Sequence, residues 1–126
     1  SNWLPDNYEG DTLIHLVERL SIERQQASPQ ACWNEFLQVL ASGNISNTVD
    51  LMTDDGYSDM RRNVPPQEME ITLKRRGQEW QQSAIRWENI SKTSATARLS
   101  TKGKERVLEM LKINGLWQVD AITEMD

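Results

Sequence analysis

The sequence predicts an α+β fold in which helices come first and an antiparallel sheet follows. Apolar residues recur at helical spacing up to about residue 82, and after residue 83 they alternate with polar residues. The dipeptides Lys102-Gly103 and Asn114-Gly115 are typical of tight hairpin turns and divide the alternating region. Because helices and strands that are segregated along a chain pack as separate layers, we expect helices on a single antiparallel sheet.

The first residues predict an irregular lead-in followed by an extra helix. Residues 1–10 combine Pro, Gly, Asn and Asp, which favour turns over regular structure. Asp11 is a suitable N-cap for a helix over residues 11–27, where apolar residues recur at helical spacing. The chain has no internal repeat, linker or low-complexity run, so residues 1–126 are expected to form one domain.

Two further helices are predicted to meet at a tight corner. Ser28 is a good N-cap, and Pro29 suits the first helical position because its missing N–H would have no partner there. Gly43 suits the residue after the helix, where φ is usually positive. Asn44 or Ser46 can cap the next helix, so we expect the two helices to form a V.

The segment after this corner is expected to leave and then resume helical structure. Residues 53–57 (TDDGY) are predicted to end the third helix, and residues 57–64 indicate a short edge strand or an irregular link. Pro65-Pro66 then begins a helix that runs to about Gln82.

The last two strands are expected to be apolar on both faces. Residues 107–113 form a nearly continuous apolar run, typical of a strand that is covered on each side. This interpretation places Leu108 and Met110 on the face away from the helices, where a second copy of the chain or the N-terminal helix would cover them. Because side chains alternate between the two faces of a strand, the last strand is expected to have Trp117, Val119 and Ala121 on one face and Leu116 and Ile122 on the other.

Two stretches carry a resemblance to a known fold. "FLQVLASGNISNTVDLMTDD" (36–55) is a helix that ends at Gly-Asn before a second helix and an acidic break, and "VLEMLKINGLWQVDAI" (107–122) is a long strand that turns through Asn-Gly. With the helix over residues 65–82 between them, they resemble the nuclear transport factor 2-like superfamily. This is the cone-shaped α+β fold shared with ketosteroid isomerases.

The resemblance covers about residues 29–123 and leaves the helix over 11–27 as an addition to the fold. It implies a curved sheet that packs against the V formed by the two helices, and a homodimer that forms through the face of the sheet. The chain looks most similar to small, exported bacterial members. It departs from the enzyme members in its poorly defined first strand and in its short strands over residues 84–100.

Charge is distributed unevenly along the chain. The formal net charge is −5, and the acidic excess lies in residues 1–60, where Arg19 and Arg24 are the only basic residues. A nucleic-acid partner is not expected, because phosphate binding needs a concentrated basic surface. Either the charged side chains of both halves are simply solvated, or the acidic helical half binds a basic protein partner.

The expected location is the periplasm or the medium. The chain begins with Ser1-Asn2 rather than Met, as after signal-peptide removal, although a cloning scar on a cytoplasmic protein would look the same. No apolar stretch approaches the roughly 18–20 residues that a membrane-spanning helix needs. Cys32 is the only cysteine, and its helical surroundings indicate a buried structural thiol.

The polar residues do not form a recognisable catalytic set. Ketosteroid isomerase-like sites combine a carboxylate base with a tyrosine and an acid that donate to the substrate. Tyr57 and Asp59 come nearest to this pair, but the adjacent arginines favour a surface ion pair for Asp59. Asp120 is the other carboxylate that could face the cone, and His15, the only histidine, has no evident partner.

Metals and cofactors are not expected either. One histidine and one cysteine are too few for a typical zinc site. The acidic cluster over residues 54–59 lacks the spacing of a calcium loop, and no glycine-rich phosphate loop occurs.

The tryptophans are the residues most suggestive of a binding site. Indoles bury a large apolar area and keep an N–H that needs a partner. The candidate residues of an apolar ligand pocket in the cone are Tyr57, Trp80, Arg86, Trp87 and Trp117. The alternative is that these side chains simply fill the core between the helices and the sheet.

Three functions are compatible with this sequence. The first is a non-catalytic module that binds a small apolar ligand or a protein. The second is an isomerase- or hydratase-like enzyme that acts on a small apolar substrate in the cone. The third is an inhibitor or immunity-type protein that binds a basic partner through its acidic half.

Overall fold

The corner at Gly43 is built as the sequence predicts. In the computed structural model, which describes residues 27–125, helix α2 (Pro29–Ser42) begins after Ser28, whose hydroxyl oxygen accepts a hydrogen bond from the Ala31 N–H at 3.1 Å. Gly43 ends the helix with a φ of 74°, and its N–H donates to the Leu40 carbonyl at 2.8 Å. Both predicted boundaries of this helix are confirmed.

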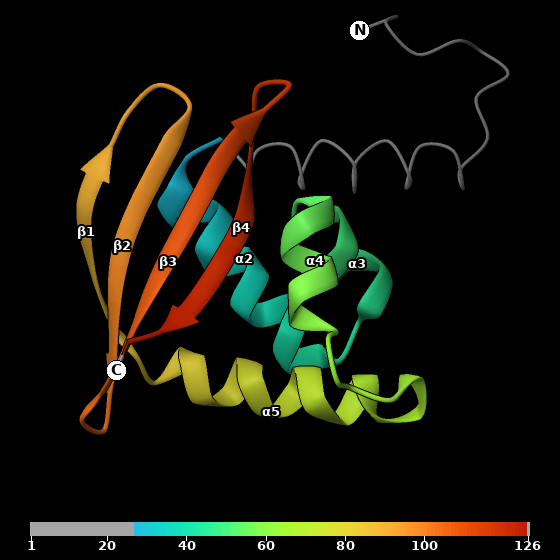
Figure 1. The fold of residues 1–126 in the computed structure, drawn as a ribbon. Helices are drawn as coiled ribbons and strands as arrows, with labels where there is room; N and C mark the ends of the chain where they lie inside the picture. The colour runs from blue at the N-terminus through green and yellow to red at the C-terminus, as the bar shows by residue number, and fades with distance from the viewer. Residues whose placement is uncertain (1–26, 126) are drawn as a thin grey trace, which may run out of the picture.

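Asn44 starts the next helix, α3 (Ile45–Asp50). Its side-chain oxygen accepts a hydrogen bond from the Asn47 N–H at 3.0 Å, so Asn44 is the N-cap and Ser46 lies inside the helix. The helices α2 and α3 are therefore separated only by Gly43 and Asn44 (Figure 1).

A further helix, α4 (Asp54–Met60), follows where the sequence indicates a helix end. The hydroxyl oxygen of Thr53 accepts a hydrogen bond from the Gly56 N–H at 3.0 Å, and two aspartates occupy the first turn. The interpretation of residues 53–57 as a terminator is wrong, because Thr-Asp-Asp also meets the requirements of a helix N-terminus. Within residues 27–125, the edge strand considered for residues 57–64 does not form.

The helix expected from Pro65-Pro66 is present as a 3₁₀ turn, η1 (Pro66–Glu68), and helix α5 (Met69–Gln81). Gly77 brings α5 close to α2. A Cβ atom at Gly77 would lie 2.5 Å from the backbone nitrogen of Ala41, so the absence of a side chain permits this approach. The predicted helix is confirmed.

Four antiparallel strands follow in the order β1-β2-β3-β4. The two connections that the sequence predicts are tight turns in which both central residues have positive φ, 49° and 81° at Lys102-Gly103 and 53° and 81° at Asn114-Gly115. These angles are those of type I′ hairpin turns, which match the twist of paired strands. The strands are β1 (Ala84–Ile90), β2 (Ser94–Thr101), β3 (Lys104–Ile113) and β4 (Leu116–Glu124).

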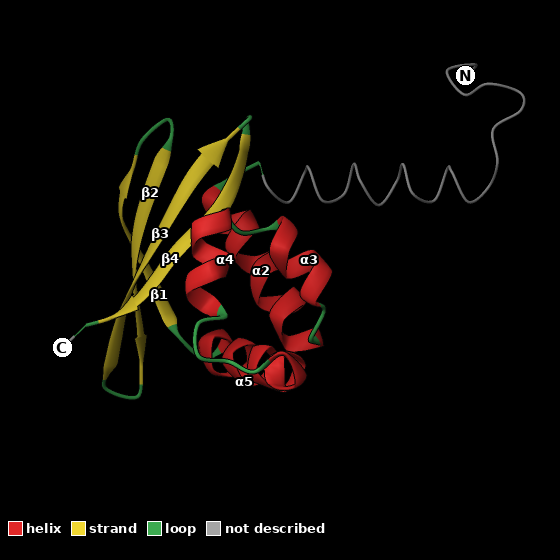
Figure 2. Ribbon diagram, turned by 45° about the vertical axis from the view of Figure 1, so that its right-hand side comes forward, coloured by secondary structure: helices red, strands yellow, loops and turns green. Residues whose placement is uncertain are grey.

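The helices gather on one face of the sheet, as Figure 2 shows. Apolar side chains from both layers form one core, with Phe36, Leu40, Leu73, Leu99 and Val119 fully buried. The predicted α+β class is confirmed. Core formation between two layers is the expected outcome, because each layer has one apolar face to bury.

Some expectations concern parts of the chain that the structure does not describe. The lead-in over residues 1–10, the body of the extra helix over 11–27 and His15 lie outside the described residues. Among residues 27–125, none of the helices has the length and apolar character needed to span a membrane.

Leu108 and Met110 lie on the face that the helices cover, contrary to the expectation from the sequence. Both are fully buried, whereas Leu111 and Ile113 on the opposite face are 37% and 39% exposed. Because β3 is apolar on both faces, its own pattern does not identify the inner face. The register of β3 with its neighbouring strands determines which of its faces packs against the helices.

A β-bulge in β4 changes which residues face the helices. The pairing with β3 shifts between Val119 and Ala121, which leaves Asp120 as the extra residue. Beyond the bulge, Ile122 pairs with Leu108 and packs against the core. The expectation that Ile122 lies on the face opposite Trp117 and Val119 is therefore wrong, because strict alternation does not hold across a bulge.

Candidate functional site

A cavity of about 310 Å³ lies between α4, α5 and the ends of β3 and β4. Its apolar lining consists of Met52, Met60, Trp80, Ala121 and Ile122. Its charged lining consists of Asp59, Arg76, Glu79, Arg106 and Glu124. An apolar pocket with a few convergent polar groups is the usual form of a small-molecule site.

Gly56 lets α4 pack directly on β4 and so forms one wall of the cavity. A Cβ atom at this position would lie 2.6 Å from the carbonyl oxygen of Asp120 and 2.9 Å from that of Val119. Thr53 secures the contact, since its N–H donates to the Val119 carbonyl at 2.9 Å and its hydroxyl donates to the Asp120 carboxylate at 2.7 Å. The helix start is thereby fixed to the strand at the bulge.

Arg106 extends from β3 towards α5 and is 5% exposed. Its Nη2 donates to the Glu79 carboxylate at 2.8 Å and to the Glu124 carboxylate at 3.3 Å. Its Nη1 is buried and has no hydrogen-bond partner within residues 27–125. One side of the guanidinium is thus bound by two carboxylates, while the other side is unpaired.

Trp80, which also lines the cavity, carries a second buried donor without a partner in residues 27–125. Its side chain lies on α5, is 7% exposed and packs against Trp33 with ring centroids 6.4 Å apart. The indole Nε1 is buried and has no partner among the described residues. An unsatisfied buried donor costs about 1–3 kcal/mol, and native proteins leave few of them.

Arg76 and Asp59 complete the charged lining. The Nη1 of Arg76 donates to the Met60 carbonyl at 2.8 Å, and burial lowers the pKa of Arg76, with neighbouring Arg75 lowering it further. The guanidinium nevertheless keeps its charge at neutral pH. Asp59 accepts a hydrogen bond from Arg62 at 2.7 Å, and its side chain is 60% exposed, so it lies at the solvated rim.

Of the five candidate residues named from the sequence, only Trp80 lines this cavity. Tyr57 lies on α4 but lines a different hollow, and its ring lies 5.9 Å from the Arg61 guanidinium carbon. Trp117 is 4% exposed in the core, with Lys112 Nζ 6.0 Å from its ring. The expected convergence of the aromatic residues does not occur, because they come from different faces and ends of the elements.

Trp87 and Arg86 lie on β1, far along the sheet from β4. The indole N–H of Trp87 donates to the Gln30 side-chain oxygen at 2.7 Å. Arg86 points to the other face, as strand alternation requires, and its guanidinium lies 3.6 Å from the Glu88 carboxylate. Neither residue contributes to the cavity lining.

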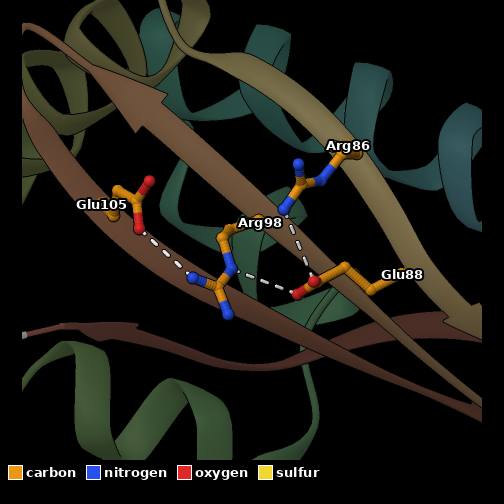
Figure 3. Close-up of polar contacts among 4 residues, drawn as sticks. All are labelled: Arg86, Glu88, Arg98 and Glu105. Atoms are coloured by element: carbon orange, nitrogen blue, oxygen red, sulfur yellow. Dashed lines mark hydrogen bonds and ion pairs between the residues drawn. The ribbon is translucent and has the colours of Figure 1, made fainter.

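The charged groups around Arg86 form a surface network across three strands (Figure 3). Arg98 on β2 donates to Glu88 and to Glu105, each at 3.2 Å. The hydrogen bond and charge of Glu88, with a further hydrogen bond from Glu105, raise the pKa of Arg98. These exposed pairs are screened by solvent and add little to stability, so we interpret them as a solvated outer face.

Sequence reasoning missed Arg106, Glu79 and Arg76. The sequence carries half of the signal for Arg106: alternation puts it on the same face as Leu108 and Met110, but the pattern of β3 does not identify which face is the inner one. A charged residue on the core-facing side of a strand is unusual and needs a partner. The partner, Glu79, is distant in sequence and has no comparable signal.

The three candidates for proton transfer named from the sequence, Tyr57, Asp59 and Asp120, do not converge in this cavity. Asp59 lines the cavity, but Tyr57 does not, and the Asp120 carboxylate binds the Thr53 hydroxyl outside it. Residues 27–125 contain no group of three or more His, Cys, Asp or Glu side chains that could hold a metal ion.

Sequence comparison assigns the chain to no family. No protein-family model matches it, and no curated protein matches its sequence. The function is therefore argued from the cavity, which has an apolar lining and a rim of mixed charge.

Proposed function

We propose that the protein is a non-catalytic binding module of the nuclear transport factor 2-like superfamily that holds a small ligand in the cavity between α4, α5 and β4. The observation that carries this proposal is the cavity itself, in which an apolar wall meets a set of charged side chains, namely Asp59, Arg76, Glu79, Arg106 and Glu124.

The size of the cavity favours a small organic molecule. Ligand pockets usually measure about 300–1,000 Å³, and this cavity, at about 310 Å³, is at the lower end of that range. Two methionine side chains, Met52 and Met60, line it together with an indole ring. Methionine adapts its shape to irregular partners, which suits binding to an apolar body.

A binding role is favoured over catalysis by the state of the carboxylates. A general base needs to be within hydrogen-bond reach of the proton that it takes from the substrate. Asp59 is exposed and paired with Arg62, and Glu79 and Glu124 are both bound to Arg106. This arrangement supports recognition without proton transfer.

A screen of small organic molecules by ligand-observed NMR tests the proposal. We expect compounds that bind the full-length chain to lose at least about tenfold in affinity with Ile122→Trp, because the larger side chain fills the cavity. Ile71→Trp is the matched control, since Ile71 is 61% exposed on α5. Compounds that bind Ile122→Trp and the unchanged chain equally, or a screen without any binder, would overturn the proposal.

A further inference from the structure

A second hollow, of about 330 Å³, lies between α5 and the turn that joins β2 to β3, at the end of the sheet near α5 (Figure 1). Its charged lining consists of three cations, Arg75, Lys102 and Lys104, and one carboxylate, that of Glu79. The uncharged lining consists of Gln78, Gln82 and Thr101. The hollow is therefore basic, although the chain has a formal net charge of −5.

The three cations of this hollow have no counter-ion in the described chain. Most arginine and lysine side chains of residues 27–125 have an ion pair, a hydrogen bond or an aromatic ring as a partner. The exceptions are Arg75, Lys92, Lys102 and Lys104, and all of these except Lys92 line the hollow. Cations that are held around one hollow repel one another, and an anion bound between them relieves this repulsion.

The negative groups beside the hollow do not neutralise it. The Glu79 carboxylate accepts a hydrogen bond from Arg106 at 2.8 Å, so a buried guanidinium already balances its charge. The hollow also lies at the C-terminal end of α5, where Gln82 is the C-cap and the helix dipole is equivalent to roughly half a negative charge. The charge of three cations exceeds this contribution, so a positive potential remains.

The backbone at Lys102 is unusual for a lysine. Lys102 has a φ of 49° and is the first central residue of a type I′ turn, where Asn, Asp or Gly is favoured. A longer side chain is disfavoured at such an angle, and residues in uncommon backbone conformations occur often at ligand sites. Lys102 therefore supplies a cation at a position where the turn itself does not favour lysine.

A phosphate group suits this lining better than a carboxylate. Arginine and lysine bind phosphate through charge-assisted hydrogen bonds, and glutamine amides add further N–H donors. A phosphate monoester carries a charge of about −1.5 to −2 at neutral pH, so it matches several cations, whereas a carboxylate carries a single charge. Among the residues that line the hollow, none is apolar, so the ligand needs no apolar body.

From these observations we propose that the hollow between α5 and the β2–β3 turn binds the phosphate group of a small soluble molecule, with Arg75, Lys102 and Lys104 as the binding residues. The site is distinct from the apolar cavity, although Glu79 lines both. The proposal does not depend on the proposed function, and phosphorylated compounds are left out of the screen that tests the apolar cavity.

Titrations of the full-length, ¹⁵N-labelled chain test this site. Inorganic phosphate, glycerol 2-phosphate and acetate are each added at a constant ionic strength of about 0.1 M, and the backbone amide resonances of the β2–β3 turn are followed. We expect both phosphate compounds to bind with a Kd below about 10 mM and acetate to bind at least about tenfold more weakly.

Three outcomes would overturn the proposal. If acetate binds as tightly as phosphate, the cations attract any counter-ion and the hollow is not a phosphate site. If inorganic phosphate binds and glycerol 2-phosphate does not, the hollow holds only the free ion. If neither phosphate compound shifts the resonances of the turn, the cations are simply solvated.

Two variants test the assigned residues. Lys102→Asn removes a charge and suits the type I′ turn, and Lys104→Gln removes a charge from the adjoining strand. We expect each to weaken phosphate binding about fivefold, the value of one ion pair near the surface. Lys92→Gln is the matched control, because Lys92 is also exposed and unpaired within residues 27–125 but lies at the opposite end of β2. Unchanged affinity in Lys102→Asn and Lys104→Gln, or an equal loss in Lys92→Gln, would contradict the proposal.

Discussion

Arg106 on β3 and Glu79 on α5 form an ion pair at 2.8 Å that joins the sheet to the helix across the wall of the cavity. The arginine side chain is 6% exposed and the glutamate side chain is 42% exposed, so one partner is buried and the other is open to solvent. Both residues line the cavity, so the geometry of its charged wall depends on this pair.

Glu79→Gln should lower the free energy of unfolding by about 1–2 kcal/mol, because it weakens a charge-assisted hydrogen bond to a buried guanidinium. The loss should be smaller than the roughly 3–5 kcal/mol of a fully buried pair, since Glu79 is partly solvated and Glu124 remains. Urea unfolding measures it. Glu70→Gln, which affects an exposed pair with Lys74, is the control and should cost less than about 0.5 kcal/mol. Equal losses in the two variants would show that Arg106 does not depend on Glu79.

Gly77→Ala should destabilise the protein by about 1–3 kcal/mol, because the added methyl group is forced against the α2 backbone. A Cβ atom there would lie 2.5 Å from the Ala41 backbone nitrogen. The sign of this stability change is informative, since alanine in a helix normally stabilises by about 1 kcal/mol relative to glycine. Thermal unfolding, with the exposed neighbour Gln78→Ala as the control, distinguishes the two effects. A stabilised Gly77→Ala variant would contradict the close approach of α5 and α2.

Thr53→Ala should cost about 1–2 kcal/mol through the loss of an N-cap. The hydroxyl group accepts from the Gly56 N–H and donates to the Asp120 carboxylate, so it fixes both the start of α4 and the contact with β4. Thr53→Ser keeps the hydroxyl group and should retain most of the stability. If Thr53→Ser is as unstable as Thr53→Ala by urea unfolding, the hydroxyl contacts are not responsible.

Cys32 makes stability depend on pH in the alkaline range. Burial, and then the nearby Glu35 carboxylate, raise the pKa of the Cys32 thiol from 9.0 to about 12. Because the folded state holds the proton more tightly than the unfolded state, this stability is fully present below pH 9.0 and is lost as the pH rises towards 12. We expect a loss of about 1 kcal/mol per pH unit above pH 9.

Urea unfolding between pH 7 and pH 11 measures this dependence, and Cys32→Val provides the comparison because it removes the titrating group. The variant should lose less stability per pH unit than the unchanged chain. Parallel curves for the two proteins would mean that the thiol ionises equally in the folded and unfolded states.

Much of the fold could be predicted from local signals. Ser28, Gly43 and Asn44 act on their own backbone or on residues three or four positions away, so the sequence alone indicates their roles. The turn at Asn114-Gly115 is equally local. The start of α4 at Thr53 has the same kind of signal, but its polar composition also favours a turn.

The cavity was less predictable because its parts meet only through tertiary packing. Glu79 and Arg106 are distant in sequence, and no local pattern relates them. The bulge at Asp120 moves Ile122 to the inner face, which strict alternation does not anticipate. Trp80 was identified from its residue type, whereas Trp87 and Trp117 have the same type but different surroundings.

The most direct test of the central claim is a crystal structure of the full-length chain with the tightest-binding compound from the small-molecule screen. We expect the compound to occupy the cavity between α4, α5 and β4, in contact with Met52, Met60 and Ile122. A compound bound instead in the hollow beside Tyr57, or on the outer face of the sheet beside Arg86, would contradict the account.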